Sequence, residues 1–446
     1  MTSETIKRSL RYSTLDGIFA SIMLGIGDSF MTPYALAMGA SAGLIAVLAS
    51  VPMLVSSLVQ LRSAPMVERL GSRMSLINPA VFLQSLLWIP IIAIPYVFES
   101  HRALYLVFFY TIFASMGAFA FPPWSSLMAD HIAETERGKF FGWRNRLLGA
   151  VNVASMLLAG VTLYFYNAAA GGNNGPQGII RKFLGFTAIF TVAFLARLIS
   201  WKFLIKMYEP PLVIKEEHKF TFKAFLKRMR RSNFGRFVAF AASMNFAVFI
   251  GAPFLPVYML RDLKFNYLLY TMITMTATLT MLLAMNHWGS HADHVGNRRV
   301  LRLTSFFIPL IPVLWLFSHN VAYLLFVQIF AGFFWAGFNL SASNFIYDAV
   351  TPEKRTRCIA YFNVINGLAV VSGSLFGGYL LKVMPPLWGY KILGVLLISG
   401  LMRFLSAFLC SSVREVRPVK NISNARLFYS IIGMRPLLSV SGGAKE

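Results

Sequence analysis

The feature that most constrains the fold is a series of long apolar segments that recurs along the whole chain. Each spans roughly 18–28 residues, enough to cross a ~30 Å hydrocarbon core as a helix, whereas the strands of membrane barrels alternate over ~10 residues. A helix satisfies its own backbone hydrogen bonds in lipid, so these segments predict membrane-spanning helices. We count twelve: 13–38, 43–61, 76–97, 103–128, 141–166, 183–204, 235–260, 267–287, 301–318, 321–347, 358–381 and 387–411.

Composition agrees with this interpretation. Hydrophobic residues make up 57% of the chain, charged residues only 13%, and the mean hydropathy is +0.63. A soluble domain usually carries about 25% charged residues. The basic start of the chain precedes an apolar run that is too long for a signal-peptide core, so we expect residues 13–38 to stay in the mature protein. The sequence predicts an all-α integral membrane protein.

The positively charged residues are distributed unevenly along the chain. The net charge is +24, and most of the 41 Lys and Arg residues lie at alternate ends of the predicted helices. By the positive-inside rule, both termini are then cytoplasmic in a multi-pass plasma (inner) membrane protein. The basic run 222–236 is best interpreted as a segment facing anionic membrane lipid, and we expect no nucleic-acid partner. Cys358 and Cys410 both lie near the cytoplasmic face, where we expect no structural disulfide.

The second half of the chain repeats the first. The stretch 64–73 matches 289–298 at an offset of 225, and 129–145 matches 347–363 at an offset of 218. A third match aligns 194–200 with 400–406. We therefore predict a six-helix half over 1–204, a basic cytoplasmic linker over 205–234, a second six-helix half over 235–411 and a cytoplasmic tail over 412–446. Two parallel halves of this kind are the plan of one large transporter class.

Two copies of a loop motif strengthen this interpretation. After the second helix of the second half stand Gly289, Asp293, His294, Gly296, Arg298 and Arg299, and the matching loop of the first half carries Ala64, Glu68, Arg69, Gly71 and Arg73. This pattern, with Arg137-Gly138 after the fourth helix, resembles the major facilitator superfamily. The resemblance implies twelve helices in two pseudo-symmetric halves and secondary transport. The segment 141–166 lacks a Gly-Pro pair and 103–128 lacks an arginine, and both departures weaken a drug-antiporter interpretation.

The loop motif predicts two charge clusters at the cytoplasmic face. Gly71 and Gly296 can supply the positive φ that a tight turn between helices needs. The expected gate residues are Glu68, Arg69, Gly71, Arg73, Asp130 and Arg137 in one cluster, with Asp293, Gly296, Arg298, Asp348 and Arg355 in its sister. In the resembled family such clusters hold the halves together on the cytoplasmic side. The alternative is that these charges only fix the topology.

Asp28 is the leading candidate for a binding site. It interrupts an apolar run, where an unpartnered carboxylate is costly. The repeat supplies a control, because 27–34 aligns with 251–258 and places Ala252 opposite Asp28. A carboxylate present in one half only is typical of a site residue, and we expect it to bind a proton or a cationic substrate group. The alternatives are a carboxylate that caps a helix break near Pro33, or one that is solvated at the outer mouth.

Other residues could line a central cavity. Most are polar or aromatic side chains within predicted helices, and for each the alternative is an interhelical hydrogen bond or a packing role. The candidates are Tyr34, Gln84, Trp88, Asn152, Asn245, Gln328, Trp335, Asn339, Asn366 and Lys391. Arg197 and Arg403 occupy matching places in the two halves, so we interpret both as structural.

These features favour a secondary active transporter that moves a small solute or ion by alternating access, with proton coupling through Asp28 as one form. We find no catalytic constellation, no P-loop and no metal-ligand set, so we expect no enzyme activity and no cofactor. The expected partners are the substrate and membrane lipid, and the expected state is a monomer. Two alternatives remain open: a lipid flippase on the same fold, and a non-transporting receptor or assembly factor.

Overall fold

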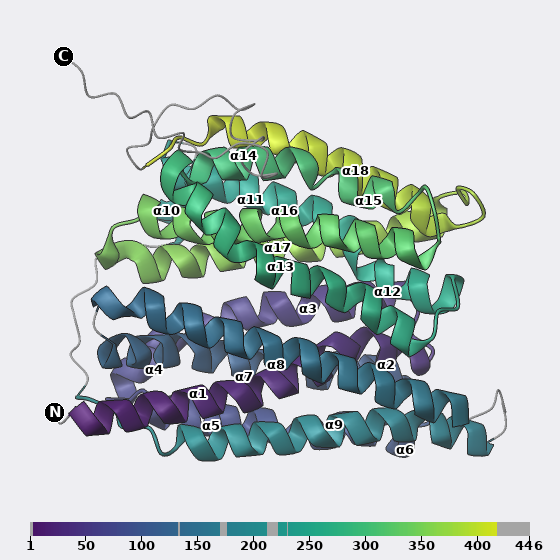
Figure 1. The fold of residues 1–446 in the computed structure, drawn as a ribbon, viewed down its shortest axis with the longest axis horizontal. Coiled ribbons are helices and arrows are strands. Elements are labelled where there is room, and N and C mark those ends of the chain that lie inside the picture. Colours follow the sequence, from purple (N-terminus) through teal and green to yellow (C-terminus); the bar gives the residue numbers. More distant parts are fainter. Residues whose placement is uncertain (1–2, 133, 170–175, 212–221, 230, 417–446) are drawn as a thin grey trace, which may run out of the picture.

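The computed structural model describes residues 3–132, 134–169, 176–211, 222–229 and 231–416. Within these ranges the side chains of 3, 134–139, 176–182, 223, 224, 228, 352, 353, 355 and 356 are not described. The described chain is a bundle of long, roughly parallel helices (Figure 1). The first half lies in the lower part of that view and the second half in the upper part, with the first and the last described residues of the chain at the same end of the bundle, which we call the end of the termini.

The first half contains six spans, of which the first and the third are divided by a break. Its elements are α1 (Ser3–Ile26), η1 (Asp28–Phe30), α2 (Met31–Ala37), α3 (Ala42–Gln60), α4 (Ser63–Leu70), α5 (Met74–Leu86), α6 (Trp88–Val97), α7 (Arg102–His131), α8 (Glu134–Ala169) and α9 (Pro176–Leu204). Gly71 follows the last residue of α4 and has a φ of 63°, the positive value predicted for this turn.

The second half repeats this plan with its own breaks. Its elements are α10 (Phe222–Met229), α11 (Asn233–Gly251), η2 (Ala252–Phe254), α12 (Leu255–Val257), η3 (Tyr258–Asp262), α13 (Tyr267–Val295), α14 (Asn297–Phe307), α15 (Leu310–Leu314), α16 (Val321–Ala349), α17 (Pro352–Val383), α18 (Lys391–Leu409) and η4 (Cys410–Ser412). Gly296, between α13 and α14, has a φ of 88° and so supplies the second predicted turn.

Eleven spans in the described part of the chain are long and apolar enough to cross a membrane. The twelfth expected helix, 301–318, is divided into α14 and α15 by a turn at Ile308 and Pro309. A proline lacks the N–H of a continuing helix and favours such a division. The all-α architecture of twelve spans is therefore confirmed, with broken helices where uniform ones were expected.

The halves meet along two helix pairs, α3 with α17 and α8 with α13. Glycines allow close approach in the second pair, because a Cβ added at Gly160 would lie 2.3 Å from Thr271 Oγ1. Small residues serve the same purpose in many membrane helix contacts. At the end of the bundle that holds the termini, Asn363 Nδ2 of α17 donates to Gln60 Oε1 of α3 at 3.0 Å.

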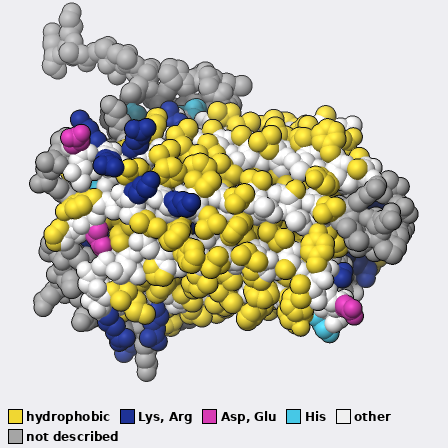
Figure 2. Space-filling view, turned by 90° about the horizontal axis from the view of Figure 1, so that it is seen from below, with side chains coloured by type: hydrophobic (Ala, Val, Ile, Leu, Met, Phe, Trp, Pro, Cys, Tyr) yellow, Lys and Arg dark blue, Asp and Glu magenta, His cyan; other side chains and the backbone are white. Residues whose placement is uncertain are grey.

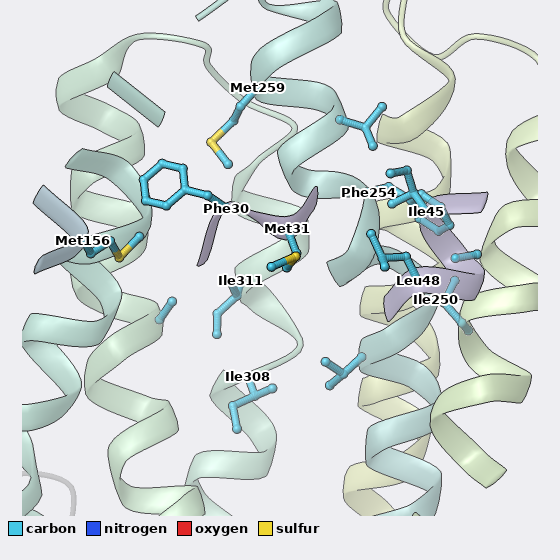
Figure 3. Close-up of a cluster of buried hydrophobic side chains, with 14 of the residues drawn as sticks. Phe30, Met31, Ile45, Leu48, Met156, Ile250, Phe254, Met259, Ile308 and Ile311 are labelled. Atoms are coloured by element: carbon cyan, nitrogen blue, oxygen red, sulfur yellow. The ribbon is translucent and has the colours of Figure 1, made fainter. Parts of the chain in front are cut away.

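One apolar core runs through both halves. Figure 3 shows part of it, where Ile45 and Leu48 of the first half lie beside Ile250 and Phe254 of the second. Figure 2 shows that hydrophobic side chains also cover the middle of the outer surface. Lys and Arg side chains gather mainly toward one end of this face, the end that holds the termini in Figure 1, as the charge pattern predicted.

Candidate functional site

Asp28 lies at a break in the first span. Gly27 separates α1 from the short 3-10 turn η1, which begins at Asp28. A Cβ at Gly27 would lie 2.4 Å from Cη2 of Trp88, so only glycine lets the chain pass over that fully buried indole. The carboxylate is therefore carried by a turn whose path is set by close packing.

The carboxylate is solvent-accessible although it lies within the span. The Asp28 side chain is exposed, and Tyr110 Oη of α7 donates to its Oδ1 at 3.3 Å. That is its single hydrogen bond among the described residues. The next residue lies at the contact between the halves, since Tyr270 Oη of α13 donates to the Ser29 carbonyl at 3.2 Å. Phe30 packs edge-on against the same tyrosine. Asp28 thus lies beside the junction of the two halves.

The second half has the same break without the acid. Its 3-10 turn η2 spans Ala252–Phe254, at the offset of 224 that the alignment of 27–34 with 251–258 predicted. Phe254 is fully buried, like Phe30. The fold accepts a small apolar residue at the position of Asp28, so the carboxylate is not needed to form the turn.

A buried polar network lies deeper in the first half. Asp16 Oδ1 accepts from Ser200 Oγ at 2.6 Å, and that hydroxyl accepts from Arg197 Nη1 at 2.9 Å. Arg197 Nε also donates to Gln84 Oε1 at 2.8 Å, and Gln84 Nε2 donates to the Phe113 carbonyl at 3.2 Å. Asp16 is only 6% exposed and has its counter-charge close by. The two acids of this predicted span therefore differ, since Asp16 is buried and paired whereas Asp28 is exposed.

A second arginine supports this network. Arg144 is buried, donates to the Ser13 carbonyl at 3.0 Å and lies 4.9 Å from the centre of the Trp124 ring. A Cβ at Gly17 would lie 2.4 Å from its Nη2, so the glycine beside Asp16 makes room for the guanidinium. The positions that match Asp16 and Arg144 in the repeat are Phe240 and Phe362. The second half therefore lacks a counterpart of this buried acid and of the arginine beside it.

Most other candidates are engaged within one half. The amide of Asn245 donates to Asn366 Oδ1 at 3.0 Å, and that of Asn152 donates to the Ser21 carbonyl at 3.4 Å. Gln328 Nε2 donates to the Ile273 carbonyl at 3.2 Å. These bonds match the interhelical alternative stated for each residue.

The aromatic candidates are packed. Tyr34 is 1% exposed and its hydroxyl donates to the Ile91 carbonyl at 2.9 Å, while Trp88 packs against Phe113 and Phe190. Trp335 is half-buried against Phe338.

Two further candidates are exposed. Asn339 makes a long contact of 3.7 Å with Met281 Sδ. Lys391 lies at the end of the bundle opposite the termini, where its Nζ donates to the Lys382 carbonyl at 3.4 Å. Neither of them joins the Asp28 turn.

The charge cluster predicted for the first half forms around Arg73. Its Nη2 lies 2.7 Å from Asp130 Oδ2, and the guanidinium is almost fully buried. Glu209, just beyond α9, accepts from Ser72 Oγ at 2.6 Å and from the backbone N–H of Arg73 and Met74. It therefore caps α5, where an anion also interacts favourably with the helix dipole. All of these contacts lie within one half.

The sister cluster uses the same plan with other side chains. Glu415 Oε2 accepts from the Arg298 N–H at 2.8 Å, which places it at the start of α14. Asn297 Nδ2 donates to Asp348 Oδ2 at 2.8 Å. Asp293 lies in the last turn of α13, close to Gly296.

The remaining gate candidates of the first half lie on α4 or among the side chains that the structure does not describe. Glu68 and Arg69 are exposed on α4. The side chains of Arg137 and Arg355 lie outside those that the structure describes. The described inter-half contact at this end is instead the bond between Gln60 and Asn363.

Sequence reasoning missed four residues that matter here: Asp16, Tyr110, Glu209 and Glu415. Two of them carried a usable signal, because Glu209 and Glu415 each follow the last helix of their half. Asp16 was overlooked because it lies near the start of its expected span, and Tyr110 because a tyrosine in an aromatic-rich helix is usually core.

Known proteins share this architecture. The chain is 29% identical over 105 residues to the efflux pump azaK of Aspergillus niger, a match that covers 24% of this chain and only about a fifth (22%) of the pump. Among solved structures, it superposes on a D-xylose–proton symporter with a TM-score of 0.68 at 13% identity, covering 93% of this chain and 99% of the other. For the nucleoside transporter NupG the TM-score is 0.67 at 14% identity, covering 91% and 100%.

A bacterial homologue of the human lysosomal transporter Spinster, in an inward-facing and unoccupied conformation, gives a TM-score of 0.64 at 13% identity, covering 93% and 99%. At these identities the likeness shows the fold. The family model named Major Facilitator Superfamily matches residues 17–285 and 237–441, which together span most of the chain. The chain therefore belongs to the Major Facilitator Superfamily.

Proposed function

We propose that this protein is a secondary active transporter that works by alternating access and couples solute movement to protons through Asp28. The single observation that carries the proposal is the state of that carboxylate. It is solvent-accessible within a span, it lies beside the contact between the halves, and its one described hydrogen bond comes from the neutral hydroxyl of Tyr110. Ionisable groups in such positions commonly mark ion or substrate pathways.

The contrast with Asp16 supports this choice. Asp16 is buried and has Arg197 one hydroxyl away, so its charge is compensated inside the protein. Asp28 has no ion pair among the described residues, so a proton or a cationic group must supply the compensation when the site closes to water. A carboxylate whose partner comes from solution can link closure to binding.

The location of Asp28 supports a role in the conformational cycle. Ser29 and Phe30 both contact Tyr270 of the second half. A change in the angle between the halves would therefore move the residues next to the carboxylate and alter its exposure. In transporters built from two repeats, the substrate and coupling ion bind at this kind of junction.

The first experiment identifies a solute. Purified protein would be screened for thermal stabilisation against a metabolite collection, since a ligand at 100 times its Kd adds about 2.7 kcal/mol. A hit would be tested for accumulation in proteoliposomes under an imposed pH gradient, with internal pyranine reporting proton entry. The proposal fails if uptake is independent of the proton gradient and no proton flux accompanies it.

Asp28 is then tested by separating exchange from accumulation. Asp28→Asn and Asp28→Ala should fold, because alanine occupies the matching site at Ala252. We expect both variants to retain solute counterflow, which needs no net proton movement, and to lose proton-driven accumulation. Loss of counterflow and of solute binding together would assign Asp28 to the substrate instead. Wild-type rates and an unchanged pH profile in both variants would remove Asp28 from the mechanism.

A further inference from the structure

A cavity of about 540 Å³ lies at the end of the bundle opposite the termini, which is the outer end by the charge pattern. Its lining combines Ala42 of α3 with residues of the second half: Val257, Arg261, Asp262, Leu381, Gly389, Tyr390, Lys391 and Ile392. We propose that this cavity binds a small organic anion, an oxyanion group on an apolar body. This site is separate from Asp28 and does not depend on the proposed transport mechanism.

The net positive charge of the residues that line the cavity favours an anionic ligand. Arg261 and Lys391 contribute two positive charges, and Asp262 contributes one negative charge, which leaves one positive charge in excess. Arg261 Nε is 3.1 Å from Asp262 Oδ1, so one cation is already compensated. Lys391 has only a 3.4 Å contact with the Lys382 carbonyl and keeps its charge available. A monoanion would restore neutrality.

The rest of the lining suits an apolar body. Ala42, Val257, Leu381 and Ile392 are apolar, and Tyr390 combines an aromatic ring with a hydroxyl. Cavities of about 300–1,000 Å³ with apolar walls and a few polar groups are typical small-molecule sites. The lining is thus a mixture of polar and apolar surface, and the volume suits an organic acid better than a small inorganic ion, which would leave most of it unfilled.

The backbone around the cavity is irregular in two places. Arg261 and Asp262 belong to η3, a π-helix, a rare conformation that is often found at functional sites. Next to the lining residues Gly389 and Tyr390, Trp388 has a φ of 47°, an unusual conformation for a bulky residue, in a turn closed by two hydrogen bonds between Leu387 and Tyr390. Strained backbone of this kind is retained where the surrounding structure holds it.

The repeat again serves as a control. The positions that match Arg261 and Asp262 in the first half are Ala37 and Met38, and Gly185 matches Lys391. The matching segment α2 is an ordinary α-helix that ends at Ala37. The fold therefore does not require the charged π-helix or the lysine, and their presence in one half points to a ligand.

The test uses radiolabelled benzoate and equilibrium dialysis with the full-length protein in phosphatidylcholine nanodiscs. Lys391→Gln and Arg261→Gln should each weaken benzoate binding by about tenfold or more, because each removes a charged partner. Asp262→Asn should strengthen it severalfold. Lys264→Gln is the matched control, since Lys264 is exposed on the adjoining loop and does not line the cavity. Asp28→Asn should leave benzoate affinity unchanged.

Nanodiscs of different lipid composition then distinguish a free organic acid from an anionic lipid headgroup as the ligand. Benzoate binding that persists in phosphatidylglycerol nanodiscs assigns the site to a free organic acid. Competition by phosphatidylglycerol, relieved in Lys391→Gln, assigns it to an anionic lipid headgroup. The proposal is overturned if benzoate does not bind in phosphatidylcholine, or if Lys264→Gln weakens binding as much as Lys391→Gln does.

Discussion

Replacing Asp16 with asparagine should reveal how strongly the first half depends on its buried charges. The carboxylate and the Arg197 guanidinium share the Ser200 hydroxyl through hydrogen bonds of 2.6 and 2.9 Å, so the charged groups are no more than about 5.5 Å apart. With an effective dielectric constant of ~20, Coulomb's law gives an attraction of about 3 kcal/mol at that distance. Asp16→Asn removes the attraction and leaves the guanidinium in place.

We therefore expect Asp16→Asn to lower the free energy of unfolding by about 3 kcal/mol, roughly 150-fold in the unfolding equilibrium. The assay is reversible unfolding in mixed dodecylmaltoside–SDS micelles, followed by the fluorescence of the eight tryptophans. The double variant Asp16→Asn, Arg197→Gln should be more stable than Asp16→Asn alone, because it also removes the uncompensated cation.

The second half supplies the control for this experiment. Arg403 occupies the place that matches Arg197, is 4% exposed, and contacts the Val248 carbonyl at 3.4 Å with no carboxylate beside it in the described part of the chain. Arg403→Gln should thus cost less stability than Arg197→Gln. The reasoning is refuted if the double variant loses the sum of the two single losses, since additivity would mean that Asp16 and Arg197 do not interact.

Three further predictions follow from local geometry. Gly27→Ala should destabilise the protein by about 1–3 kcal/mol, because the added methyl would overlap the Trp88 ring, and a wild-type melting temperature would contradict this. Gly160→Leu should widen the α8–α13 contact, because a Cβ there already meets Thr271 Oγ1 at 2.3 Å; spin-label distances across that contact should lengthen, and unchanged distances would exclude the effect. Glu209→Ala should cost about 1–2 kcal/mol in micelle unfolding through loss of the α5 cap, whereas Glu209→Asp should recover part of it; equal losses would argue against capping.

Several features of the fold could be predicted from the sequence because they depend on residues that are close together along the chain. The length and hydropathy of a segment decide whether it can span lipid. The repeat could also be recognised from the sequence. The breaks at Asp28–Phe30 and Ala252–Phe254 are separated by the same offset as the aligned segments of the two halves. Positive φ at Gly71 and Gly296 follows from the turn that joins two helices.

The partners of the polar side chains could not be predicted in this way. Gln84 was a cavity candidate, yet it binds Arg197, 113 residues away, and Asp16 meets Ser200 across 184 residues. Such a pairing depends on the rotation of each helix about its axis and on its depth relative to distant helices. Glycines such as Gly17 and Gly27 then decide which large side chain fits against them.

The sequence by itself therefore determined the class, the two halves and the presence of a carboxylate in one of them. Tertiary structure decided that Asp28 is accessible and Asp16 is sealed, although both are aspartates in the same predicted span. The physical reason is that hydropathy is a sum over neighbours in the chain, whereas the environment of a charge is a sum over neighbours in space. For Asp28 the spatial neighbours are Tyr110 of α7 and the inter-half contact with Tyr270, which lie 82 and 242 residues further along the chain.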